Sequence, residues 1–147
     1  MFISTDWLRE FIEIPKTFDA RELAKLITIR SAEVEGVVDQ KKALENIIVG
    51  KVLKLEKHPN ADRLTVCEVD TGKEKVVVVC GGSNLKEGML VALALPGAVV
   101  KWHGEETVTI EKSKVRGVES NGMICASEEI GLGAGEEKEI MDLSDLK

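Results

Sequence analysis

Three segments of the chain combine charged and polar side chains with turn-forming residues, a combination suited to binding anions or nucleobases. The first runs from His58 to Arg63 and follows Lys54 and Lys57. Its proline holds the preceding residue in an extended conformation, and Asn60 can bond to backbone amides, so the loop would present Arg63 on a stiff support. The alternative is a self-capped turn with a solvated arginine.

The second segment begins where an apolar run ends in two glycines, followed by Ser83, Asn84 and then Lys86. The glycines let the backbone approach a ligand and turn amides toward an anion, but they equally form a corner at the end of a strand. No Gly-Lys-Ser or Gly-Lys-Thr follows, so the segment is not a phosphate loop. Cys80 and His58 could form a nucleophilic pair, although no third residue that would orient the histidine is evident.

The third segment has the sequence KVRGVESNGMIC. Lys114 and Arg116 would point to the same side if this stretch is a strand. Ser120 and Asn121 can both donate to and accept from the edge of a base. The alternative is a turn whose Met123 fills the end of a hydrophobic core.

Two short amphipathic helices are expected before residue 40. Ser4 or Thr5 can cap the first, whose apolar face continues to Ile12 and which ends at Pro15. Asp19 caps the second helix, and the glutamate three residues later completes a capping box.

Five strand-like runs follow, at residues 47–55, 64–69, 76–80, 89–95 and 107–110. Thr71-Gly72 and Pro96-Gly97 between them suit tight turns. Short strands separated by turn residues predict a small antiparallel barrel or sandwich. The polar segments described above would lie at the ends of these strands.

Composition and charge place the chain among soluble globular proteins. Its 147 residues are 44% hydrophobic and 31% charged, and no apolar run approaches the roughly 18 residues of a membrane span. Cys67, Cys80 and Cys125 have no CxxC spacing, which indicates a reducing, cytoplasmic location and no zinc site. The net charge of −6 argues against non-specific nucleic-acid binding.

The distribution of charge and of aromatic residues is more informative than the totals. Residues 47–118 carry 11 Lys/Arg against 9 Asp/Glu, whereas residues 119–147 carry 2 against 8. Only Trp102 among the five aromatic residues lies beyond position 18. Because single-stranded nucleic acid is usually held by stacking on aromatic rings, RNA contact by the strands would depend on phosphates, shape and polar base edges.

The order of the motifs resembles a known family. The series HPNADRL, VVCGGSN, PGA and VRGVESNGMICASEEIGL, within residues 44–132, resembles the tRNA-binding OB domain of the EMAP II type. The opening of the chain, MFIS followed by WLREF and later AEVEGV, is similar to that of the bacterial phenylalanyl-tRNA synthetase β subunit. The chain is therefore interpreted as an N-terminal fragment of such a subunit.

This resemblance implies a mainly β fold, a five-stranded OB-fold barrel over residues 44 to about 125, preceded by a small N-terminal α/β segment with two short helices. Residues 1–39 would form an incomplete N-terminal domain, and residues 40–147 the OB-fold domain with an acidic tail. Further polypeptide completes the N-terminal domain in the family. We therefore expect incomplete burial of Trp7, Phe11, Leu23 and Ile27 in this chain.

The function implied is that of a tRNA-binding accessory module of phenylalanine-tRNA ligase, supporting aminoacylation without a catalytic centre of its own. Its partners would be tRNA, the α subunit and the remaining β-subunit domains, with no membrane; ATP and magnesium are expected only in the parent enzyme, and no cofactor in this fragment. The predicted tRNA-binding residues are Lys54, Lys57, Asn60, Arg63, Ser83, Asn84, Lys86, Lys114, Arg116, Ser120, Asn121 and Met123.

Three alternatives remain at this point. The barrel could be a structural or assembly module of the same synthetase with little or no RNA contact. It could be a free-standing tRNA-binding protein that self-associates. A small hydrolase that uses Cys80 or Cys125 is the third alternative.

Overall fold

A computed structural model describes residues 3–15, 17–102, 106–133 and 139–145 of the chain. It divides the chain into two compact units, Met1–Gln40 and Lys41–Lys147. None of the helices in the described residues is long and apolar enough to cross a membrane.

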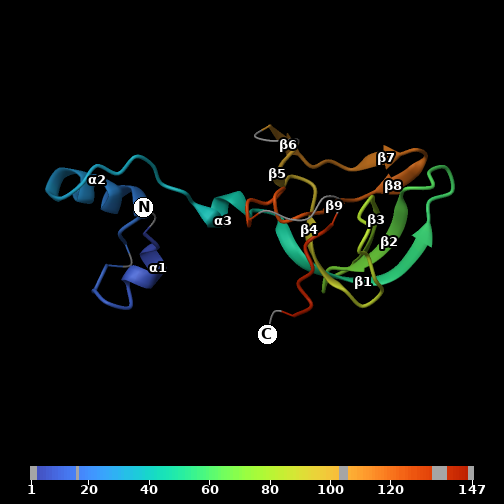
Figure 1. The fold of residues 1–147 in the computed structure, drawn as a ribbon, viewed down its shortest axis with the longest axis horizontal. Helices are drawn as coiled ribbons and strands as arrows, with labels where there is room; N and C mark the ends of the chain where they lie inside the picture. The colour runs from blue at the N-terminus through green and yellow to red at the C-terminus, as the bar shows by residue number, and fades with distance from the viewer. Residues whose placement is uncertain (1–2, 16, 103–105, 134–138, 146–147) are drawn as a thin grey trace. The chain divides into compact units, whose positions relative to one another are not determined.

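The first unit contains two capped helices, α1 (Thr5–Leu8) and α2 (Ala20–Arg30) (Figure 1). The hydroxyl of Ser4 accepts a hydrogen bond from the amide of Trp7, and the carboxylate of Asp19 accepts from the two amides at the start of α2. Both predicted caps are confirmed. The helix predicted through Ile12 is shorter than expected, because the chain leaves the α-helical pattern after Leu8 and continues in turns.

Apolar side chains of this first unit are exposed. Trp7 is 61% and Phe11 67% exposed, although the two rings pack edge to face with centroids 5.2 Å apart. Leu23 and Ile27 of α2 are only half-buried. The predicted incomplete burial of these four residues is confirmed, since a four-residue helix and one longer helix cannot cover each other's apolar faces.

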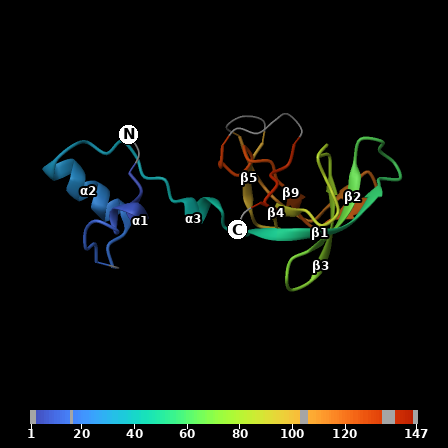
Figure 2. The same cartoon turned by 60° about the horizontal axis from the view of Figure 1, so that its bottom comes forward.

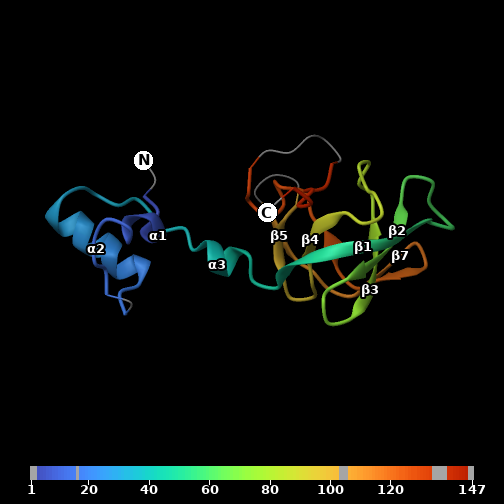
Figure 3. The same cartoon turned by 90° about the horizontal axis from the view of Figure 1, so that it is seen from below.

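The second unit is built from strands and one short helix, α3 (Gln40–Ala43), which begins at the last residue of the first unit. The strands are β1 (Ile47–Lys57), β2 (Thr65–Asp70), β3 (Lys75–Cys80), β4 (Leu90–Ala94), β5 (Val99–Lys101), β6 (Thr107–Thr109), β7 (Ser113–Val115), β8 (Val118–Ser120) and β9 (Met123–Ile124). Five of them form one antiparallel sheet in the order β3-β2-β1-β4-β9. Long β1 pairs with β4 along its first half and with β2 along its second (Figure 3).

The sheet curls into a nearly closed barrel, since β3 meets β8 and β9 on its other side. The amide of Asn121 donates to the carbonyl oxygen of Val77 at 2.8 Å, and the amide of Val79 donates to the hydroxyl of Ser120 at 3.0 Å. A register shift between Val52 and Lys54 marks a bulge where β1 bends. The predicted mainly β, OB-like barrel is confirmed.

The fifth strand of the sheet differs from the one predicted. Residues 107–110 were expected to provide it, but β6 pairs with β5 in a separate two-stranded sheet, and β9 closes the main sheet beside β4. A strand of two residues is too short to produce an alternating pattern in the sequence. Its place depends on tertiary packing, because Ile124 is buried in the barrel core.

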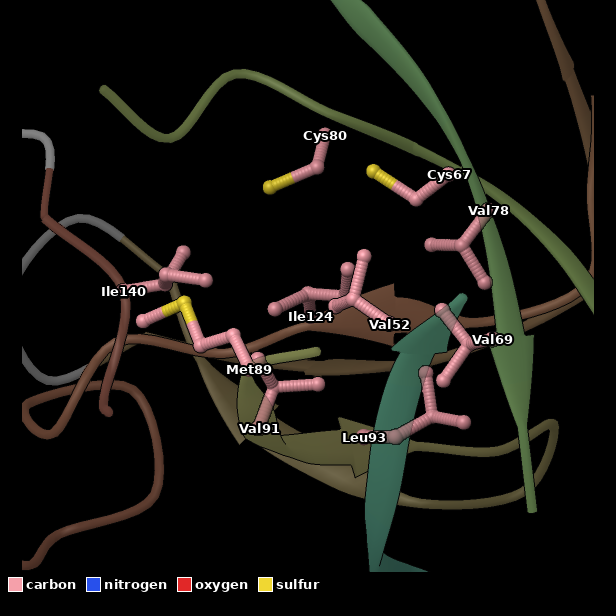
Figure 4. Close-up of a cluster of buried hydrophobic side chains, with 10 residues drawn as sticks. All are labelled: Val52, Cys67, Val69, Val78, Cys80, Met89, Val91, Leu93, Ile124 and Ile140. Carbon is pink, nitrogen blue, oxygen red and sulfur yellow. The ribbon is translucent and has the colours of Figure 1, made fainter. Parts of the chain in front are cut away.

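The barrel core consists of two clusters of buried side chains. The first includes Val52, Cys67, Val78 and Leu93 from four strands (Figure 4). The second lies around Ala94, Val100 and Cys125. Residues 139–145, which we call the C-terminal strap, contribute to both clusters, Ile140 to the first and Leu143 to the second.

The C-terminal strap is tied to the barrel through its backbone. The amide of Met141 donates to the carbonyl oxygen of Cys125 at 3.0 Å, and the amide of Leu143 donates to that of Leu90 at 2.8 Å. Figure 2 shows this red segment beside β4 and β9. The expected acidic tail is therefore, over residues 139–145, an integral part of the barrel.

Candidate nucleic-acid interface

The β1–β2 loop is joined to the β7–β8 hairpin by two side chains. His58 is 5% exposed, and its Nε2 lies 2.9 Å from the carbonyl oxygen of Val115. Its Nδ1 accepts from the amide of Asn60 at 3.1 Å, so Nε2 carries the proton and donates it to Val115. The side-chain amide of Asn60 donates to the carbonyl oxygen of Arg116 at 3.0 Å. We call these two residues the His58–Asn60 latch.

The hairpin held by this latch has a two-residue turn. Val115 pairs with Val118, and between them Arg116 has a φ of 47° and Gly117 a φ of 98°. Left-handed values at both turn positions define a type I′ turn. Arg116 is thus in the turn and not in a strand with Lys114, and the expectation that their side chains share one strand face is wrong.

Four cationic side chains lie at this end of the barrel: Lys57 at the end of β1, Arg63 in the β1–β2 loop, Lys114 in β7 and Arg116 in the turn. We call them the loop-end cluster. Figures 1 and 3 show that the β1–β2 loop and the β7–β8 hairpin occupy the same end. All four are exposed, and none forms an ion pair with a carboxylate in the described residues; the strand register places Glu119 opposite Lys114, without an ion pair between them.

The outer face of the β1-β2-β3 sheet, in contrast, neutralises its own charge. The strand register places Lys54 beside Glu68 and Lys51 beside Asp70, and Asp70 beside Lys75. The hydrogen bond from Lys54 to Glu56 raises the pKa of that lysine, and the one from Lys75 to Glu68 does the same for Lys75. Lys54 is therefore already paired with a carboxylate, unlike the four residues of the loop-end cluster.

The predicted residues of the second segment lie against the C-terminal strap. The side-chain amide of Asn84 donates to the carbonyl oxygen of Ile140 at 2.9 Å and accepts from the amide of Ile140 at 3.0 Å. The Ser144 hydroxyl and amide, and then the charge of Lys86, lower the pKa of Asp142. Ser83 is exposed in the same loop. These contacts hold the loop against the C-terminal strap. Both the Nδ2 and the Oδ1 of Asn84 are engaged by the backbone of Ile140.

The predicted base-reading residues differ in accessibility. Ser120 is 3% exposed; its hydroxyl donates to the carbonyl oxygen of Gly122 at 2.9 Å and accepts from the amide of Val79. Met123 packs against the second core cluster. Asn121 is half-buried. The hydroxyl of Ser120 therefore connects β8 to β3 inside the barrel.

The three thiols are buried in the barrel. Burial raises the pKa of Cys67 and of Cys125 to about 12, and it raises that of Cys80 as well. Both ring nitrogens of His58 are engaged by Val115 and Asn60. A buried thiol whose pKa is raised stays protonated at neutral pH and is a poor nucleophile, and both ring nitrogens of the histidine are occupied, so this geometry disfavours the hydrolase alternative.

Comparison with known proteins agrees with the barrel. A family described as "Putative tRNA binding domain" matches residues 47–146, which is most of the chain. The chain belongs to this family. The chain is also similar to phenylalanine-tRNA ligase β subunits from bacteria, which confirms the resemblance predicted from the sequence. It is 45% identical over 133 residues to that of Chlorobaculum tepidum and 42% identical over 145 residues to that of Protochlamydia amoebophila.

These matches cover nearly the whole chain but a small part of each relative. The first spans 90% of the chain and 16% of the Chlorobaculum protein, and the second 99% and 18% of the Protochlamydia protein. A solved structure, that of a MetRS related protein from Pyrococcus horikoshii, superposes with a TM-score of 0.52 at 20% identity. It covers 76% of this chain and 93% of that protein, and it supports the fold of this tRNA-binding family member.

The sequence did not indicate a role for Val115, whose carbonyl oxygen accepts the hydrogen bond from His58. The predicted role of Asn60 was to bond to amides within its own loop, whereas its side chain donates across to the hairpin. The signal that could have suggested a connection is a histidine followed by proline in a polar loop, because a loop histidine that is buried needs partners for its ring nitrogens.

Proposed function

We propose that this barrel is a tRNA-binding accessory module of a phenylalanine-tRNA ligase β subunit, and that it contacts the RNA backbone through the loop-end cluster. The membership of the tRNA-binding family and the identity to ligase β subunits support the proposal. The single observation that carries it is the gathering of four exposed, unpaired cations around the latched loops of the described barrel.

The roles of the predicted residues differ in this proposal. Lys57, Arg63, Lys114 and Arg116 contact phosphates, because they are exposed and not already paired with a carboxylate in the described residues. Asn121 remains the candidate for reading a base edge. The other predicted residues act through the fold or lie outside the loop-end cluster.

Under this proposal the barrel takes no part in the chemical steps and helps only to bind the tRNA. Activation of the amino acid with ATP and magnesium belongs to the rest of the enzyme, whose α subunit and remaining β-subunit domains are the protein partners. The barrel contributes electrostatic attraction and orientation of the tRNA. Phosphate contacts fix orientation and register but carry little sequence information, so this module would hold tRNA without selecting the phenylalanine acceptor by itself.

A salt titration of tRNA binding tests the proposal. Neutralising four phosphates predicts a slope of log K against log salt of about −3, and a loss of roughly 60-fold between 50 and 200 mM salt. Arg63→Ala and Arg116→Ala should each reduce the magnitude of that slope by about 1. Lys73→Ala is the matched control, since Lys73 is exposed in the β2–β3 hairpin at the opposite end of those strands. Unchanged affinity in both arginine variants at low salt would overturn the proposal.

One observation favours an assembly module as the second candidate. An apolar groove of about 160 Å³ lies on the barrel beside the start of β1 and the strap, lined by Leu44, Ile47, Ile48, Val49, Ala92, Ile130, Leu132, Met141 and Leu143. Val49 is 56% and Leu132 44% exposed there. Another domain of the same synthetase is the occupant this alternative requires, since the relatives extend far beyond the matched region.

The two candidates predict opposite mutational results. Val49→Asp should abolish binding of the chain to the rest of the synthetase if the groove is an assembly surface, and should leave tRNA affinity unchanged. Arg116→Ala should do the reverse under the tRNA proposal. Calorimetric titration of each variant against tRNA and against the remaining enzyme separates them.

A further inference from the structure

The geometry assigns His58 and Asn60 as positioning residues, which act on RNA through Arg116 and not by contact of their own. This inference rests on the proposed function, because it concerns how the loop-end cluster is held. It gives the polar residues of the first segment a role different from the phosphate or base contact expected from the sequence.

His58 has a structural role in the barrel. It is one of only two buried polar side chains among the described residues, the other being Ser120. Both of its ring nitrogens are engaged, one by Val115 and one by the amide of Asn60. Its imidazole therefore has no group left for a ligand, and its effect on binding must pass through the segments that it joins.

Asn60 contacts the backbone of the turn that carries Arg116. Its side-chain amide donates to the carbonyl oxygen of Arg116 at 3.0 Å. The ideal position for a Cβ on Gly117 lies 3.6 Å from the same amide nitrogen, so the asparagine packs directly against the turn. Loss of this side chain would release the turn without removing any charge.

Arg116 has an unusual backbone conformation. Its φ of 47° lies in the left-handed region, where asparagine and glycine are favoured over arginine. An arginine at such a position persists only where the surroundings hold it. The latch provides such a restraint, and a restrained turn loses less conformational freedom when Arg116 meets a phosphate.

A double-mutant cycle on the 147-residue chain, with bulk tRNA as the probe, tests the inference. Asn60→Ala should weaken tRNA binding about fivefold at low salt, the effect of one ordinary hydrogen bond. In the Arg116→Ala background the same change should cost less than about twofold, because the group on which it acts is gone. A merely structural role would give the same cost in both backgrounds.

Asn84→Ala is the matched control, since this asparagine also holds a backbone segment with its amide, but at Ile140. It should lower the melting temperature and leave both tRNA affinity and the effect of Arg116→Ala unchanged. Equal costs of Asn60→Ala in the two backgrounds, no cost in the native background, or the same coupling in Asn84→Ala would each overturn the inference. Failure of the proposed function is distinguishable, because then Arg63→Ala and Arg116→Ala leave tRNA affinity unchanged.

Discussion

The Nε2 of His58 donates a hydrogen bond to the carbonyl oxygen of Val115, a residue 57 positions further along the chain, over 2.9 Å. This contact fixes one polar loop against another whose turn carries Arg116. The backbone conformation of the turn and the charge that it carries are therefore two separate properties. Substitutions can change one of them while leaving the other in place.

Arg116→Asn should separate stability from binding. Asparagine followed by glycine is the preferred pair for a type I′ turn, so relief of the left-handed arginine should stabilise the protein by about 0.5 to 1 kcal/mol. The melting temperature should rise by roughly 2 to 4 °C, while tRNA affinity falls because a cation is lost. Arg63→Asn is the control: Arg63 has no positive φ, so it should weaken binding with no gain in melting temperature. A lower melting temperature for Arg116→Asn would contradict the account of this turn.

Ile140→Ala should destabilise the barrel without affecting the loop-end cluster. Ile140 is 7% exposed in the first core cluster, and loss of a buried aliphatic side chain of this size costs about 2 to 5 kcal/mol. Urea unfolding followed by circular dichroism measures the effect, and the salt slope of tRNA binding should stay at the native value. Val99→Ala is a surface comparison in the same unit, since Val99 is 51% exposed, and it should change stability by less than about 0.5 kcal/mol.

The thiols should be protected in the folded protein. Because burial holds the pKa of Cys67 and Cys125 at about 12, their thiolate fraction at pH 8 is roughly one in ten thousand. Ellman's reagent should therefore titrate the three cysteines slowly in buffer and rapidly in guanidinium chloride. Fast reaction of any thiol under native conditions would show that a cysteine is accessible and reactive.

Acid should weaken the start of α2 through Asp19. Hydrogen bonds from the amides of Glu22 and Arg21 lower the pKa of this carboxylate below its ordinary 3.8. The cap therefore stabilises fully above the unfolded pKa, and its contribution is lost as the pH falls through the lower folded value. Asp19→Asn keeps a capping oxygen that does not titrate. The helical signal at 222 nm should decline less between pH 5 and pH 2 in Asp19→Asn than in the native chain, and equal declines would contradict the capping role.

Strands β2 and β3 were predictable because their residues alternate between the core and the surface, and β4 was predictable as a continuous apolar run, which is buried from Val91 to Ala94. Val76 and Val78 point inward on β3, for example, while Val77 is exposed. The closing strand β9 was not predictable, since Met123 and Ile124 gain their pairing only from β4. The end of α1 at Leu8 was likewise not predictable from helical periodicity, since Trp7 and Phe11 are exposed and the apolar face has no packing that would stabilise a longer helix.

The three polar segments of the candidate site were predictable from residue type, but their grouping was not. Local turn chemistry suggests that Asn60 is structural, yet its partner at Arg116 lies 56 positions away and no local rule connects the two. The association of Asn84 with Ile140 has the same separation. Such contacts follow from barrel closure, which brings together segments that are remote along the chain.

The C-terminal strap has a consequence for synthesis of the protein. Translation supplies the strands β1 to β9 first, and Ile140 and Leu143, which belong to the two core clusters, are synthesised after all of these strands. Until then the apolar faces of Val91 and Leu93 lack part of their packing, and the nascent barrel presents a surface that chaperones or other chains can bind. The C-terminal strap therefore decides when the nascent barrel covers its own core, although the loop-end cluster draws all its residues from positions 57–116.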